Sequence, residues 1–176
     1  MLQLETGLGA GLLLAAVAGA SVDVSRHRIP NLLTVSAFVL ALAIRLLWGD
    51  GAALLAGLLA AAIAFALSFP LFALHALGGG DVKFLTAVCA FLGMERLWTG
   101  LAAIAIAGGV LALVVAIRRN SVQRTFSQLG NLVRSLAYAA LLRKHPVARQ
   151  TLATPGALKV PYGVAIAVGA VVGFYW

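Results

Sequence analysis

Long uncharged apolar stretches constrain this chain more than any other feature of its sequence. Several windows of about 20 residues contain no Asp, Glu, Lys or Arg, and about 20 apolar residues are what a helix needs to cross the hydrocarbon core of a bilayer. Hydrophobic residues make up 62% of the sequence and charged residues 10%, a balance typical of membrane spans rather than of soluble domains. The sequence therefore predicts an all-α, polytopic membrane protein.

The length of the chain limits the number of spans. Its 176 residues hold one bundle of about six helices of about 20 residues, joined by short turns. Pro30 and Asn31 are typical of a helix start, and Gly49-Asp50-Gly51 is typical of a tight turn. We expect a single membrane-embedded domain over residues 1–176, with spans near 4–22, 32–48, 52–74, 82–92, 97–117 and 160–176.

One long polar region interrupts this pattern between residues 118 and 159. Its apolar residues recur at alternating spacings of four and three, at Val122, Phe126, Leu129, Val133, Leu136 and Ala140. This periodicity predicts an amphipathic helix lying in the membrane interface. We expect it to anchor the region on lipid headgroups, with docking of a substrate as the less favoured alternative.

The basic residues predict the orientation. In a six-span threading, all 13 Lys and Arg residues except Arg45 and Arg96 fall on the side that holds loop 23–31 and region 118–159. Because basic loops stay in the cytoplasm, that side is expected to be cytoplasmic and both termini external. The net charge of +8 is thereby explained by topology, so we expect membrane lipids as partners and no nucleic acid.

Two aspartates fall on this predicted cytoplasmic face. Asp23 ends the first span, and Asp81 follows three glycines at the start of the fourth; the other acids, Glu5, Asp50 and Glu95, map to the opposite face. A carboxylate at membrane depth is costly and marks a functional site. Two carboxylates held close share one proton, so that one activates water while the other acts as the acid. The pair predicts an aspartic catalytic dyad.

Other roles for these acids remain open on residue chemistry alone. Asp81 is also suited to capping the fourth helix, and Asp23 to pairing with Arg26 or Arg28 in a solvated loop. A small proton-coupled transporter or channel would use both as a relay, although internal repeats typical of transporters are not visible in the sequence. A non-catalytic membrane scaffold for a secretion assembly would tolerate the loss of both.

Residues near the pair are candidates for substrate binding. Gly78, Gly79 and Gly80 leave bare backbone that a peptide can approach closely. Tyr162 is a candidate for lining the same cleft, with an interfacial tyrosine as the equal alternative. Lys83 is expected to extend to the cytoplasmic surface, because residues two apart on a helix do not face each other and it is therefore not expected to tune Asp81.

Metal and cofactor chemistry is not expected. The lone Cys89 excludes an internal disulfide and a cysteine-cluster metal site. His27, His75 and His145 are scattered without the spacing of metal ligands.

Taken in order, the motifs resemble those of the prepilin peptidases. They are Asp23 followed by Arg28-Ile29-Pro30-Asn31, then Gly78-Gly79-Gly80-Asp81-Val82-Lys83, then Pro161-Tyr162-Gly163. The resemblance extends over nearly the whole chain and is closest to the short form associated with Flp-type, or tight-adherence, pili.

This resemblance implies an aspartic endopeptidase of the bacterial inner membrane. Such enzymes remove the short basic leader of type IV pilin-like precursors, cutting after a glycine on the cytoplasmic side. By resemblance, Asp23 and Asp81 are the catalytic pair, and Gly78 to Gly80 belong to the signature loop. Larger family members carry an additional domain with paired Cys-x-x-Cys motifs and methylate the new pilin N-terminus. This chain has one cysteine, so we expect no methyltransferase activity.

The helix ends predict how the pair divides its proton. Asp81 begins a span, where the partial positive charge of the helix favours a carboxylate, whereas Asp23 ends one, where it is disfavoured. On this basis alone, the shared proton is expected mainly on Asp23, with Asp81 as the base that activates water.

Overall fold

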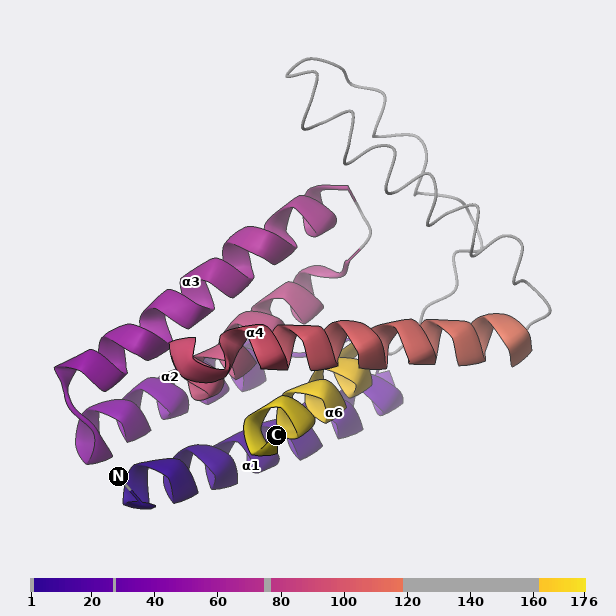
Figure 1. Ribbon diagram of the computed structural model, residues 1–176. Helices are drawn as coiled ribbons and strands as arrows, with labels where there is room; N and C mark the ends of the chain where they lie inside the picture. Colours follow the sequence, from indigo (N-terminus) through magenta and orange to yellow (C-terminus); the bar gives the residue numbers. More distant parts are fainter. Residues whose placement is uncertain (1, 27, 75–76, 119–161) are drawn as a thin grey trace, which may run out of the picture.

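The computed structural model describes residues 2–26, 28–74, 77–118 and 162–176, and every regular element within them is a helix (Figure 1). These helices are α1 (Leu2–Arg26), α2 (Asn31–Trp48), α3 (Gly51–Ala73), α4 (Gly79–Arg118) and α6 (Tyr162–Tyr175). The predicted all-α class is confirmed, and the helix bounds lie within a few residues of the expected spans.

The helices are those of an integral membrane protein. Within the described residues, α1, α2, α3 and the Gly79–Val115 part of α4 are long and apolar enough to cross a membrane. The remaining helix, α6, is apolar but has only 14 residues. Four long candidate spans are therefore present, and the count of six stays a prediction. The expected amphipathic helix from Val122 to Ala140 lies outside the described residues.

The helix α4 consists of two arms that meet at Gly93. This glycine has φ 66° and ψ −179°, a left-handed conformation that side-chain-bearing residues rarely adopt. The Leu92 side chain lies directly over Gly100, although eight residues of straight helix would separate them by about 12 Å. The chain reverses here, as Figure 1 shows, and the predicted break between residues 92 and 97 is confirmed.

A buried arginine holds the end of the first arm. Arg45 of α2 is 2% exposed. Its Nε donates to the carbonyl of Ala90 at 2.8 Å, and its Nη2 donates to that of Phe91 at 3.0 Å. Its Nη1 donates to the carbonyl of Ala53 in α3 at 3.0 Å. Because the last carbonyls of a helix have no partners within it, Arg45 supplies the donors that allow α4 to stop at Gly93.

The first arm of α4 lies at the centre of the core. Its Phe84 and Phe91 are fully buried, and their rings occupy the space that side chains at Gly19 and Gly11 of α1 would fill. The second arm also packs closely on α6, since a Cβ at Gly169 would collide with the backbone of Ile104. Close packing over small residues is typical of helices in membranes.

The end of the bundle opposite Asp23 collects the other acids and two basic residues. Arg96 makes a bidentate ion pair with Glu5, at 3.0 and 2.8 Å. Asp50 caps α3 by accepting from the amide of Ala53 at 2.8 Å. Along α1, Glu5 lies about 27 Å from Asp23. The predicted separation of these acids from Asp23 thus agrees with the structure.

Replacement of Arg45 by methionine should destabilise the bundle by about 2–3 kcal/mol, because it leaves buried carbonyls without donors. Arg96→Met is the matched control: the Arg96–Glu5 pair is partly exposed, and such pairs contribute up to about 1 kcal/mol. Thermal unfolding in detergent micelles measures both. Equal losses of Tm would show that Arg45 does not stabilise the break in α4.

Candidate active site

Three helix ends meet at the same end of the bundle. Asp23 lies in the last turn of α1, Asp81 in the first turn of α4, and Tyr162 and Gly163 begin α6. The helix α6 packs against both α1 and α4 (Figure 1). Residues from three distant parts of the chain are therefore brought into one region.

Asp23 is a buried carboxyl with a backbone partner. It is 4% exposed, and its Oδ2 accepts a hydrogen bond of 2.7 Å from the amide of Gly163. The helix α1 continues to Arg26, so Asp23 lies inside the last turn rather than in the loop that follows. The alternative in which Asp23 is a solvated loop acid is therefore wrong.

Asp81 is half-buried and is the third residue of α4. Its Oδ2 accepts from the amide of Gly78 at 3.3 Å, so it reaches back to the residue before the helix in the manner of a capping residue. Its carboxyl lies within Coulombic range of Asp23 and of the Tyr162 hydroxyl. Asp81 therefore makes a helix-capping contact and also lies near a second acid.

The three glycines before Asp81 have different surroundings. Gly78 is exposed, and a side chain there would meet the Asp81 carboxyl, with Cβ 2.8 Å from Oδ2. Gly79 faces the ring of Phe72. A Cβ on Gly80 would lie 3.5 Å from the backbone oxygen of Ile29, an ordinary contact distance. The predicted role of these glycines in substrate binding stays a prediction, and two of them also pack against neighbouring elements.

A polar contact joins the two long motifs. The Nζ of Lys83 donates to Oδ1 of Asn31 at 2.8 Å, which ties the start of α4 to the start of α2. Lys83 is exposed, as expected for a side chain that extends to the surface, but the sequence analysis did not predict this partner. Nothing local in the sequence pairs two residues 52 positions apart.

Tyr162 and Gly163 form the third part of the site. Tyr162 is half-buried, and its ring covers Gly108 in the second arm of α4. It lies near Asp81, and its role in lining a cleft stays a prediction. Gly163 is a residue that the sequence interpretation missed: it belongs to the quoted Pro161-Tyr162-Gly163 motif, but only the tyrosine was given a role.

No metal-ligand cluster of three His, Cys, Asp or Glu side chains occurs in the part of the chain that the structure describes. Cys89 is a buried free thiol. His27, His75 and His145 lie outside the described residues.

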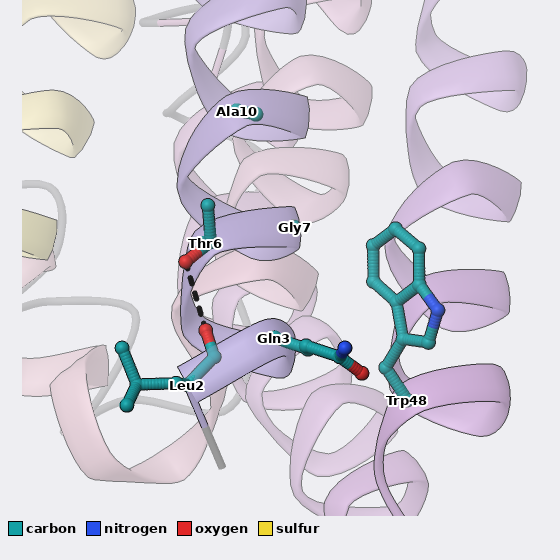
Figure 2. Close-up of a pocket in the computed structure, with 6 residues that line it drawn as sticks. All are labelled: Leu2, Gln3, Thr6, Gly7, Ala10 and Trp48. Atoms are coloured by element: carbon teal, nitrogen blue, oxygen red, sulfur yellow. Dashed lines mark hydrogen bonds between the residues drawn. The ribbon is translucent and has the colours of Figure 1, made fainter.

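A separate hollow of about 480 Å³ lies at the other end of α1 (Figure 2). Its lining residues carry no ionisable side chain; they are Leu2, Gln3, Thr6, Gly7, Ala10 and Trp48. Ala10, the lining residue of α1 nearest to Asp23 in sequence, is about 20 Å from it along the helix. This hollow is therefore not part of the acid pair's surroundings.

The fold defines a membrane-embedded all-α protein in which helix ends bring two acids to the same end of the bundle. A family model, described as the type IV leader peptidase family, matches residues 10–117. The chain belongs to this family, and it is an aspartic prepilin peptidase. The matched residues include both aspartates and the three glycines, whereas Tyr162 and Gly163 lie beyond them. No curated protein and no solved structure gives a significant match.

Gly80→Val should slow cleavage of a pilin-like precursor at least about tenfold, because overpacking of about 1–3 kcal/mol against the Ile29 backbone displaces the start of α4 and Asp81. Gly80→Ala should be tolerated, since its Cβ has an ordinary contact distance. Gly109→Val is the matched control in the same helix, where nothing lies within 4 Å. Processing rates in detergent compare the three variants, and equal rates for the two valine variants would contradict this role.

Proposed function

We propose that this chain removes the short basic leader from type IV pilin-like precursors of the Flp type, cutting after a glycine on the cytoplasmic face. We further propose that Asp23 and Asp81 are its catalytic pair. Membership of the leader peptidase family supports the reaction. The single observation that carries the residue assignment is that the helix ends bring both acids to one end of an apolar bundle, within Coulombic range of each other.

The reaction needs one ionised and one protonated carboxyl. The carboxylate takes a proton from water as the water oxygen attacks the carbonyl carbon of the scissile peptide. The carboxylic acid donates its proton toward the carbonyl oxygen, and a proton then passes to the leaving nitrogen as the C–N bond breaks. The products are the leader with a new carboxylate and the pilin with a new amino terminus. Acid–base chemistry of this kind requires no cofactor.

The substrate strand is proposed to approach along the glycine loop. Gly78 is exposed and Gly79 and Gly80 are half-buried, so their backbone is within reach of an extended peptide. Tyr162 borders the same region from α6. These residues would position the scissile bond beside the acids, which supports their assignment to substrate binding.

The proposed setting is the bacterial inner membrane, with six spans and the acid pair at the cytoplasmic end. Counting the two arms of α4 separately and including α6 gives this number. The contrast between the two ends supports the orientation: Arg26, Arg28 and Lys83 lie near the pair, whereas Arg45 and Arg96 lie at the opposite end. The region 118–159 would rest on the cytoplasmic lipid headgroups. We propose the short form of the enzyme, without methyltransferase activity.

Asp23→Asn and Asp81→Asn should each reduce cleavage at least about a hundredfold, because an amide cannot take part in acid–base catalysis. Asp50→Asn is the matched control, since asparagine also caps helices. Incubation of detergent-purified protein with a precursor, followed by sequencing of the new N-terminus, measures cleavage, and circular dichroism confirms folding. Near wild-type processing by either variant of the pair would remove that aspartate from the mechanism, and a scaffold would tolerate loss of both.

Reporter fusions after Asp50 and after Glu95 should report the external side, and fusions within residues 120–150 the cytoplasm. The reason is the retention of basic segments in the cytoplasm. A cytoplasmic signal at Asp50 would contradict the threading that places both acids on one face.

A further inference from the structure

The amide of Gly163 distinguishes Asp23 from Asp81, because its hydrogen bond is made to Asp23. It donates to Asp23 Oδ2 at 2.7 Å in buried surroundings. Because α6 begins at Tyr162, this N–H is one of the first-turn amides that have no partner within their own helix. It therefore brings a free donor and the partial positive charge of a helix N-terminus to Asp23.

Such a contact favours one protonation state. An N–H bond to a charged carboxylate is short and about twice as strong as a neutral one, so it stabilises the ionised form of Asp23. At Asp81 the corresponding donor, the amide of Gly78, is 3.3 Å away, which is longer than an ordinary N–H···O bond. A second ionised carboxyl beside Asp23 is disfavoured by charge repulsion.

The contact also leaves no space for a side chain at position 163. A Cβ there would lie 2.8 Å from Oδ2, 2.9 Å from Cβ and 3.0 Å from Cγ of Asp23. Distances under 3.0 Å are essentially not found for real Cβ atoms, so either the carboxyl or α6 would have to move. Glycine is thus the residue that lets the amide reach Asp23.

We propose that Gly163 is a positioning residue of the catalytic pair: its amide holds Asp23 as the carboxylate and leaves the shared proton on Asp81. The inference rests on the catalytic pair proposed above and assigns a separate role to each of its acids. Asp23 takes the proton from water, and Asp81 donates to the scissile carbonyl. This assignment of the proton is the reverse of the one predicted from the sequence. The sequence prediction considered only the helix ends that carry Asp23 and Asp81, whereas the structure adds the N-terminus of α6.

The first test compares two glycines of α6. Gly163→Ala should lower kcat at least about tenfold, leave KM within about twofold, and move the acid limb of the pH–rate profile to higher pH. The limb moves because a carboxylate that loses its donor is protonated more readily. This variant leaves unchanged the other described ionisable groups on this side, which are Arg26 of α1, Arg28, Asp81, Lys83 and Arg118 of α4, and Tyr162 of α6.

Gly169→Ala is the matched control. A Cβ there would collide with the Ile104 backbone, so the variant loosens the packing of α6 on α4 without touching Asp23. It should lower Tm and leave the acid limb in place. An unmoved acid limb in Gly163→Ala, or an equal movement in both variants, would show that Gly163 is only a packing residue.

The second test needs neither cleavage nor Gly163 variants. Infrared spectra near neutral pH are recorded on protein labelled with carboxyl-¹³C aspartate and carrying either Asp23→Glu or Asp81→Glu, which keep a carboxyl at both positions. The protonated-carboxyl band should show the isotope shift in Asp23→Glu and lack it in Asp81→Glu. The opposite pattern, or the absence of this band from the wild type, would overturn the inference. Failure of the wild type to cut a precursor would instead refute the proposed function.

Discussion

The bundle depends on the contact between one buried guanidinium and the carbonyls at the end of a helix. A lipid environment offers no water to carbonyls left free where a helix stops, and Arg45 supplies donors to Ala90, Phe91 and Ala53. With that end satisfied, α4 reverses at Gly93. The reversal sends the second arm back along the bundle, where it supports α6. The acid pair therefore depends on a contact made at the opposite end of the molecule.

The candidate site is built from helix ends of different polarity. Asp23 lies where α1 finishes, Asp81 where α4 starts, and the amide of Gly163 where α6 starts. The N-terminus of α6 thus offsets the unfavourable end of α1 on which Asp23 lies, while the N-terminus of α4 carries Asp81. Short, fixed contacts hold this arrangement, including the hydrogen bond from Lys83 to Asn31. Preorganised donors of this kind suit a reaction in which charge moves between two carboxyls.

Much of the fold could be predicted from the sequence, because span lengths, turn residues and hydropathy are local properties. They placed the break near Gly93 and put Asp23 and Asp81 on the same face. The contacts of Arg45 and Gly163 could not be predicted in this way. Arg45 was interpreted only as a topological charge, since its acceptors are backbone carbonyls with no side-chain signal. Gly163 lies 140 positions from Asp23, and only the packing of α6 brings its amide there.

The glycines of α6 give this helix two unlike faces. Gly169 and Gly173 lie directly on the backbone of α4 at Ile104 and Gly100, whereas Val168 and Val172 are about half exposed, at 52% and 49%. At these two glycines the backbone of α6 lies directly on the backbone of α4, with no side chain between them to absorb a shift. The outward face needs only to be apolar. Exchange of one apolar residue for another at Val168 or Val172 can thus occur without changing the distance between the first amide of α6 and Asp23.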